Sequence, residues 1–158
     1  MPCSLELSGL NYLGHPRSVQ LSRFEAACQM LGEKTYNHLL EIGYGSGIFM
    51  PELAKRCHRL SGVDIHNHSQ QVTENLKEFG VSAALHQASA TQLPFDDGQL
   101  DCIVSVSALE FVDDLDETAS ELSRVLSSNG TLVVVAPVKS WLTDLALLVL
   151  KGQRASSY

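Results

Sequence analysis

The sequence predicts an α/β fold with a mainly parallel sheet, doubly wound so that helices cover both faces. Three observations support this. Short apolar stretches alternate along the chain with segments of helical periodicity. The last apolar stretch, Thr131–Ala136, is apolar almost throughout, as in a strand buried on both faces. A turn rich in glycine joins the first stretch, Leu39–Ile42, to a helical pattern, which is typical of nucleotide-binding α/β units.

The composition is that of one ordinary globular domain. The chain has 158 residues, of which 44% are hydrophobic and 18% charged, so a substantial core can form and disorder is not expected. The formal net charge is −7, and the basic residues form no cluster. A nucleic-acid backbone is therefore not an expected partner, and a small-molecule substrate is expected instead.

The cysteines and the apolar runs bear on cofactors and location. Cys3, Cys28, Cys57 and Cys102 form no C-x-x-C pair, so neither a zinc site nor a disulfide framework is expected, and no metal is predicted. The longest apolar run, Leu145–Leu150, is far shorter than the ~20 residues that span a bilayer, and no signal peptide is visible. We therefore expect no transmembrane segment and a reducing, cytoplasmic setting.

Helical periodicity predicts four main helices, and these are Pro16–Leu31, Ile48–His58, Ser69–Phe79 and Asp114–Ser128. The first is expected to end at Gly32 and the fourth at the Asn129-Gly130 pair, because glycine commonly stops a helix. The apolar face of the second is expected to comprise Ile48, Phe49, Leu53, Ala54 and Cys57. In the third helix, Val72, Leu76 and Phe79 are expected to share one buried face.

Five apolar stretches predict the strands, and these are Leu39–Ile42, Leu60–Ile65, Val81–Ala88, Cys102–Val106 and Thr131–Ala136. Between the third and the fourth, Pro94 and the Asp97-Gly98 pair predict a turn, since these residues favour turn conformations.

The turn after the first strand contains Gly43, Gly45 and Gly47. Glycine permits a tight turn and lets a ligand lie against bare backbone, and the first N–H groups of the next helix point into the same space. A dinucleotide fingerprint would place its third Gly or Ala at Ile48, one position later than Gly47. No Gly-Lys-Ser/Thr follows, so the turn is not a P-loop.

Two acids flank this turn. Asp64 lies near the end of the second strand, 64 − 43 = 21 residues after Gly43, close to the ~20 expected for an acid that binds ribose. Its carboxylate can accept hydrogen bonds from both ribose hydroxyls. Glu41 lies inside the first strand, where an acid is costly unless it has a partner. Its position therefore favours a role in ligand binding.

Glu41-x-Gly43-x-Gly45-x-Gly47 resembles motif I of the class I S-adenosylmethionine (SAM)-dependent methyltransferases. The stretch Leu93-Pro-Phe-Asp-Asp-Gly-x-Leu-Asp is similar to one common in their UbiE-like, small-molecule branch, and Gly-Thr-Leu-Val-Val-Val-Ala-Pro follows in the family's order. The resemblance covers about residues 36–137 and is nearest the methyltransferase-11 type. It implies the strand order 3-2-1-4-5, SAM as cofactor with S-adenosylhomocysteine as product, and methyl transfer to a small molecule.

The resemblance also implies a set of site residues. The cofactor-binding candidates are Glu41, Gly43, Tyr44, Gly45, Gly47, Asp64, Ile65, Ser89, Ala90, Ser105 and Val106. Glu41 would lie near the ammonium group of SAM, Asp64 at the ribose and Ile65 on the adenine. Ser89 stands where the family often has an Asp that binds the adenine, and Ser105 and Val106 would lie beside the sulfonium. Glu110, just after the fourth strand, is the candidate general base.

Two other readings stay open. An NAD-dependent oxidoreductase uses the same glycine turn and acid, although Ile48 and the Leu-Pro-Phe stretch argue against it. A non-catalytic, SAM-binding relative of the methyltransferases is the second, because Ser89 departs from the pattern and no acceptor site can be identified. His66 and His68, two residues apart, indicate surface polarity rather than a metal site.

The ends of the chain carry the remaining expectations. One SAM-binding domain is expected over residues 1–158, with an N-terminal helix or lid over 1–35, a Rossmann-like core over 36–137 and an incomplete C-terminal helix over 138–158. Tyr12 and His15 are expected in the lid by analogy. Strands six and seven of similar enzymes have no counterpart here, so the strand Thr131–Ala136 would form an edge. We expect either a longer parent protein or a homodimer partner to cover it.

Overall fold

A computed structural model describes residues 17–136 of the chain. The elements are α1 (Arg17–Leu31), β1 (Tyr36–Ile42), α2 (Met50–Ala54), β2 (Cys57–Asp64), α3 (Ser69–Glu78), β3 (Ala84–Gln87), β4 (Leu100–Val106), the 3-10 helix η1 (Leu109–Phe111), α4 (Leu115–Val125) and β5 (Leu126–Val135). The strands form one parallel sheet in the order β3-β2-β1-β4-β5, which confirms the expected α/β class and strand order.

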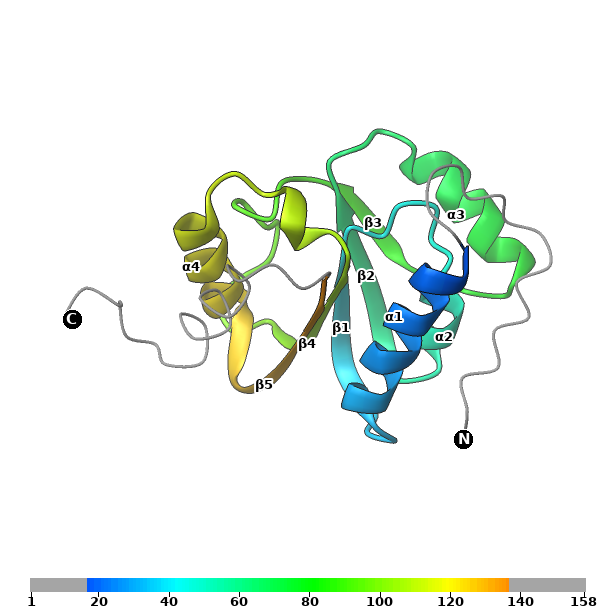
Figure 1. Cartoon of the computed structure of the whole chain (residues 1–158), viewed down its shortest axis with the longest axis horizontal. Helices are drawn as coiled ribbons and strands as arrows, with labels where there is room; N and C mark the ends of the chain where they lie inside the picture. The colour runs from blue at the N-terminus through cyan, green and yellow to red at the C-terminus, as the bar shows by residue number, and fades with distance from the viewer. Residues whose placement is uncertain (1–16, 137–158) are drawn as a thin grey trace.

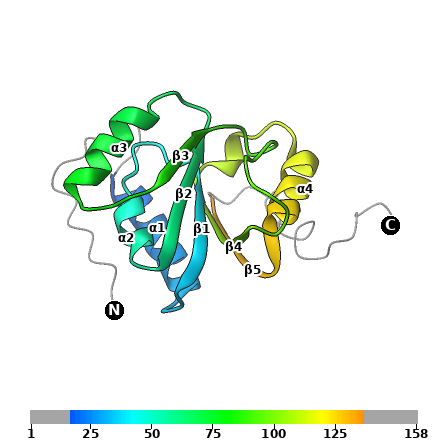
Figure 2. The ribbon, with the colours of Figure 1, turned by 180° about the vertical axis from the view of Figure 1, so that it is seen from behind.

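The sheet has a different helical layer on each face, as Figures 1 and 2 show. Helices α1, α2 and α3 pack on one face, where Phe24, Leu53 and Val72 share a core with Leu39 and Val104. Helix α4 and the chain before β4 pack on the other face. Because side chains alternate along a strand, neighbouring residues of β1 belong to different cores.

The central strand β1 brings three strand ends together. Its last residue, Ile42, pairs with Val63 of β2 on one side and with Ser105 of β4 on the other. The chain leaves β1 and β4 toward opposite faces of the sheet, so the crevice at their carboxyl ends is the switch point where α/β proteins of this kind bind ligands. The fold therefore places the glycine turn at the expected binding position.

The helix after the glycine turn is shorter than expected and covers only Met50–Ala54. Pro51 lies in its first turn, where a missing N–H has no cost, and proline disfavours helical conformation in the residue before it. The residues after Ala54 join the sheet early, because Cys57 already pairs with Tyr36. Cys57 therefore lies in β2 and not on a helical face, which corrects the prediction.

The expected break at Asn129-Gly130 is also wrong. Helix α4 ends at Val125, and β5 begins at once and runs through both residues. The ladder with β4 is irregular there: Leu100 pairs with Leu126, but Cys102 pairs with Thr131, so β5 contains extra residues in a bulge. The Asn-Gly pair therefore bends a strand rather than ending a helix.

Smaller differences concern the neighbouring elements. Phe79 follows the end of α3 and is 45% exposed, so it does not share the buried face of Val72 and Leu76. Strand β3 covers only Ala84–Gln87. The start of α4 was predicted correctly, since the side chain of Asp114 accepts a hydrogen bond from the Glu117 N–H at 2.8 Å and caps the helix.

Some expectations lie outside the described residues. These are the lid with Tyr12 and His15 and the C-terminal helix over 138–158. Within residues 17–136, β5 is the last strand of the sheet. In the same part of the chain, no helix is long and apolar enough to cross a bilayer.

Candidate functional site

The glycine turn requires glycine for conformational and steric reasons. Gly43, Gly45 and Gly47 have φ values of 77°, 52° and 76°, in the left-handed region that other residues avoid. A Cβ on Gly43 would overlap the methyl group of Ala108, and one on Gly47 would lie 2.7 Å from Val72 Cγ1. Protein atoms therefore fill the space beside these two glycines, which lets neighbouring elements pack closely on the turn.

Hydrogen bonds fasten the turn to the end of β2. The Gly43 N–H donates to Val63 O at 2.8 Å, and the Gly45 N–H donates to Asp64 Oδ2 at 2.9 Å. Asp64 is thus positioned by the turn itself. Because a carboxylate can accept about four hydrogen bonds, it keeps capacity for a ligand.

His66 holds the same glycine from the other side. Its Nδ1 accepts a hydrogen bond from the His68 N–H at 3.1 Å, so in the neutral ring Nε2 carries the proton and donates to Gly45 O at 2.9 Å. The ring also packs edge-on against Tyr44. The sequence suggested only surface polarity for His66, because its partner lies 21 residues away in the chain.

Buried polar atoms without partners gather around this turn. Within residues 20–136 they include Glu41 Oε2, Tyr44 Oη, Ser46 Oγ and Ser105 Oγ. A buried polar group without a hydrogen bond is costly, so such a cluster indicates groups that a ligand completes. Glu41, Tyr44 and Ser46 lie on the turn or just before it, whereas Ser105 pairs in register with Ile42 and faces the other side of the sheet.

Glu41 is the most perturbed of these groups. It is 1% exposed, and burial, followed by the nearby charge of Asp64, raises its pKa to about 8. Burial and Asp64 also raise the pKa of Tyr44. Without a ligand, Glu41 is therefore mainly protonated at neutral pH. A cationic group placed beside it would favour the carboxylate instead.

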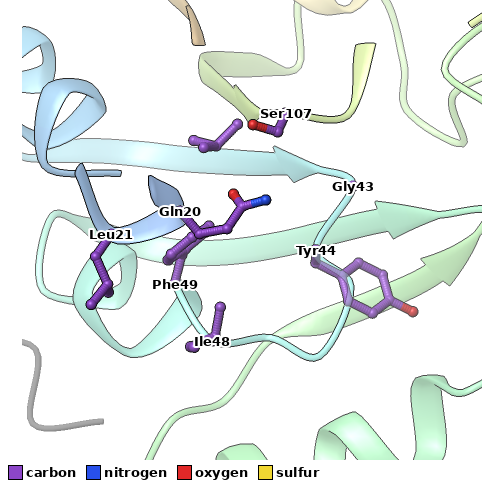
Figure 3. A pocket seen from close by; sticks show the side chains of 8 residues that line it. Gln20, Leu21, Gly43, Tyr44, Ile48, Phe49 and Ser107 are labelled. Carbon is purple, nitrogen blue, oxygen red and sulfur yellow. The ribbon is translucent and has the colours of Figure 1, made fainter. Parts of the chain in front are cut away.

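An open pocket lies between α1 and the turn (Figure 3). It is open to solvent, and about 560 Å³ of empty space lies within the pocket and its mouth together. It is lined by Gln20, Leu21, Gly43, Tyr44, Ile48, Phe49, Val106 and Ser107. Ile48, the residue that argued against a dinucleotide, forms part of its wall. Gln20, which extends from α1 into the pocket, and Ser107 were not predicted from the sequence.

The other predicted residues are spread along the carboxyl edge of the sheet. Ile65 is 77% exposed directly after β2, and Ala90 is buried. Ser89 is exposed, and its hydroxyl already bonds Thr91 Oγ1 at 2.9 Å. Val106 lines the pocket. Ser105 is fully buried on the opposite face of the sheet, since side chains alternate along β4.

Glu110 lies in η1 and is half-buried. It does not line the pocket, and its role as a base stays a prediction. Among the described residues, no group of three His, Cys, Asp or Glu side chains could hold a metal ion.

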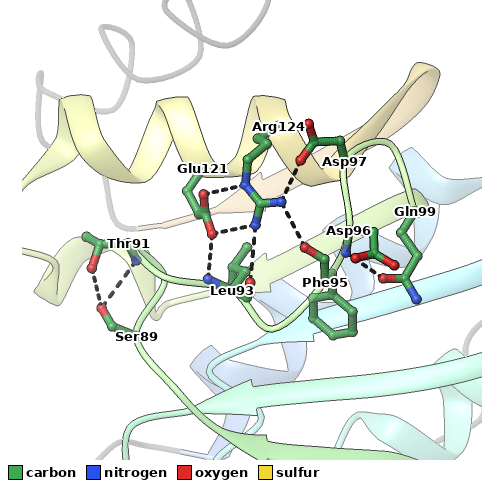
Figure 4. A network of polar contacts seen from close by, with 9 residues as sticks. All are labelled: Ser89, Thr91, Leu93, Phe95, Asp96, Asp97, Gln99, Glu121 and Arg124. Carbon is green, nitrogen blue, oxygen red and sulfur yellow. Dashed lines mark hydrogen bonds and ion pairs between the residues drawn. The ribbon is translucent and has the colours of Figure 1, made fainter.

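A polar network holds the Leu-Pro-Phe loop against α4 (Figure 4). Arg124 donates to Phe95 O at 2.9 Å and to Leu93 O at 3.2 Å, and it pairs with Glu121 and Asp97, each at 2.8 Å. Glu121 also accepts the Leu93 N–H at 2.7 Å. The network fixes the loop that follows Ser89 and Ala90, and the sequence did not reveal it.

Comparison with known proteins shows which family the chain resembles. A family model described as a methyltransferase domain matches residues 40–134. The ubiquinone/menaquinone biosynthesis C-methyltransferase UbiE of Vibrio cholerae is 32% identical over 136 residues, covering 80% of this chain and 50% of that protein. A demethylmenaquinone methyltransferase of Tropheryma whipplei is 31% identical over 110 residues, covering 69% of this chain and 45% of that protein. The chain thus spans half or less of these relatives' length.

Solved structures share the fold. A SAM-dependent methyltransferase from Aquifex aeolicus has a TM-score of 0.71 at 19% identity, covering 89% of this chain and 83% of that one. The N-methyltransferase NodS from Bradyrhizobium japonicum, solved with S-adenosyl-L-homocysteine, has a TM-score of 0.69 at 18% identity, covering 83% of this chain and 73% of that one. Because the family model covers more than half of the 158 residues and the strand order agrees, this chain belongs to the methyltransferase domain family.

Proposed function

We propose that this chain binds SAM at the glycine turn and transfers its methyl group to a small-molecule acceptor. One observation carries the proposal: the buried acid Glu41 has an oxygen without a hydrogen-bond partner beside the turn, close to Asp64, the acid that we propose binds ribose. The named activities of the relatives, which are methyl transfers to small molecules, support the same conclusion.

The residues present fit the chemical groups of SAM. Glu41 can accept a hydrogen bond from an ammonium group, directly or through water, and Asp64 can accept from ribose hydroxyls while it holds Gly45. The exposed side chain of Ile65 offers an apolar surface for a ring. Ser89 is neutral where the family often has an acid, so we expect a weaker contact with the adenine.

When bound, SAM would supply an electrophilic methyl group on a sulfonium. Transfer would need no metal, because the acceptor's bond to the methyl carbon forms as the carbon–sulfur bond breaks and S-adenosylhomocysteine leaves. The protein mainly positions the acceptor, and such positioning can supply ~7–11 kcal/mol of the barrier. The apolar wall of the pocket, which includes Leu21, Phe49 and Val106, suits a partly apolar acceptor. Glu110 stays our candidate base for an acceptor that must lose a proton.

Two experiments test this function. Calorimetric titration with SAM, S-adenosylhomocysteine and NAD distinguishes a methyltransferase site from a dinucleotide site. A methyl-transfer assay against a metabolite panel then distinguishes an enzyme from a protein that only binds SAM. Binding of NAD without S-adenosylhomocysteine would contradict the proposal, and binding without turnover would restrict it to the cofactor. The single-domain division, the homodimer or longer parent protein, and the cytoplasmic setting stay predictions.

A further inference from the structure

A contact between distant parts of the chain involves Ser107, one of the residues that line the pocket. Arg23 of α1 donates a hydrogen bond from Nη1 to Ser107 Oγ at 2.6 Å, across 84 residues of sequence. Ser107 follows β4 and is the non-glycine residue with positive φ, 56°, within residues 17–136. Its N–H donates to Val135 O at 2.7 Å, so its backbone is held in that conformation. Such a strained residue beside a pocket is often functional.

The positive charge of Arg23 and most of its hydrogen-bond donors remain available for a ligand. A guanidinium has five N–H donors, and the contact seen for Arg23 is with a neutral hydroxyl. Within residues 20–136 it has no carboxylate within ion-pair distance, whereas Arg56 and Arg124 pair with Glu52 and Glu121. Among the residues that the structure describes, the half-buried Arg23 is therefore a cation without a paired carboxylate, and its partner Ser107 lines the pocket.

The pocket also contains a second polar group from the same helix. Gln20 lies three residues before Arg23, so both side chains extend from one face of α1. Figure 3 shows the Gln20 side chain extending from α1 into the pocket, which Ser107 and Tyr44 also line. Glu41 lies on the same side of the sheet, since it pairs in register with Val104, which packs in the core formed with α1. The acidic side chain of Glu41, from β1, and the cationic side chain of Arg23, from α1, thus lie on the same side of the sheet.

We propose that Arg23 binds the carboxylate of a ligand in this pocket, with Gln20 as a second donor and Ser107 as the group that orients the guanidinium. The planar fork of arginine matches a carboxylate and can donate two parallel hydrogen bonds. The carboxylate belongs either to the amino-acid part of the methyl donor or to the acceptor. The inference rests on the proposed function, since the pocket adjoins the proposed SAM site.

A thermodynamic cycle tests the donor as the source. The ligands are S-adenosylhomocysteine and its decarboxylated analogue, which keeps the amine, the sulfur and the adenosine. The protein variants are wild type and Arg23→Gln, with Lys77→Gln on the exposed face of α3 as a control for loss of one positive charge. Arg23→Gln is expected to weaken S-adenosylhomocysteine binding roughly 10- to 100-fold, the range for lost hydrogen bonds to a charged group, and to leave the analogue unchanged. Lys77→Gln is expected to change neither.

Ser107→Ala distinguishes a ligand-binding role of Arg23 from a purely structural one. The substitution removes the hydroxyl that orients Arg23 but keeps the positive charge, so it is expected to weaken S-adenosylhomocysteine binding less than Arg23→Gln does. If Arg23 only braces Ser107, the two variants will behave alike and will weaken both ligands equally, which overturns the proposal. Circular dichroism of each variant shows whether it has folded, and Arg23→Lys, which keeps the charge, is expected to recover part of the affinity.

The acceptor arm uses the same variants saturated with SAM. Turnover of acceptors that carry a carboxylate is compared with turnover of their amides. If Arg23→Gln binds S-adenosylhomocysteine normally but loses only the carboxylated acceptors, the carboxylate belongs to the acceptor. If neither S-adenosylhomocysteine binding nor acceptor turnover depends on a carboxylate, the proposed role of Arg23 is wrong, while the proposed SAM site is unaffected. If the wild-type chain binds no S-adenosylhomocysteine, the proposed function fails and this inference fails with it.

Discussion

Replacing Glu41 with glutamine is expected to change how stability depends on pH. The substitution keeps the size of the side chain and removes its titration. In the folded, ligand-free chain, burial and the charge of Asp64 raise the pKa of Glu41 from its ordinary value of 4.5 to about 8. The unfolded chain ionises Glu41 near pH 4.5, so the stabilising contribution of the protonated group is complete below that pH. It decreases as the pH rises and is lost once the pH passes about 8.

The size of the effect follows from the same two values. Each pH unit between 4.5 and about 8 corresponds to ~1.4 kcal/mol, so the wild-type chain loses up to ~5 kcal/mol of unfolding free energy that Glu41→Gln does not lose. Urea unfolding of both proteins at pH 5 and pH 9 measures this directly, because other groups titrate in both proteins and cancel in the difference. The variant should gain on the wild type by several kcal/mol at pH 9. A difference independent of pH would show that Glu41 is not held protonated by its surroundings.

Three further substitutions test the rest of the site. Asp64→Ala should weaken S-adenosylhomocysteine binding by about 1–3 kcal/mol, since the Gly45 N–H and the ligand lose their acceptor, and an unchanged dissociation constant would contradict this. Gly43→Ala should lower the unfolding free energy by at least ~2 kcal/mol, because φ of Gly43 is positive and the new methyl group would overlap the side chain of Ala108. An unaltered denaturation midpoint would refute that reasoning. Arg124→Lys should lower the melting temperature almost as much as Arg124→Ala, because lysine lacks the planar guanidinium that donates to the Leu93 and Phe95 carbonyls. An unchanged melting temperature in Arg124→Lys would show that positive charge alone is sufficient.

The fold was predictable because its signals are local. Apolar runs such as Leu39–Ile42 are buried on both faces of a parallel sheet, and this burial can be recognised in the sequence without knowledge of the strand partners. The limits of the elements were less predictable where tertiary pairing decides them. Cys57 fits a helical spacing but joins β2 because Tyr36 offers a parallel partner. Asn129 and Gly130 fit a helix end but lie in a bulge that the ladder with β4 accommodates.

The candidate site divides in the same way. Glu41 and Asp64 could be found from the sequence, since each has a fixed place relative to the glycine turn. The contacts of Arg23 with Ser107 and of His66 with Gly45 could not, because they join segments 84 and 21 residues apart without a distinguishing motif. The close approach of Gly43 to Ala108, the residue before η1, could not be predicted either, because the two residues are far apart in the chain.

Calorimetric titration of the purified chain with S-adenosylhomocysteine at pH 7, in two buffers of different ionisation enthalpy, tests the central claim most directly. We expect binding at micromolar affinity with release of close to one proton, because the ligand's ammonium group converts the protonated Glu41 into a carboxylate. Glu41→Gln should bind more weakly and release none. A folded wild-type chain that takes up no S-adenosylhomocysteine, or binds it with the same proton balance as Glu41→Gln, would contradict the claim.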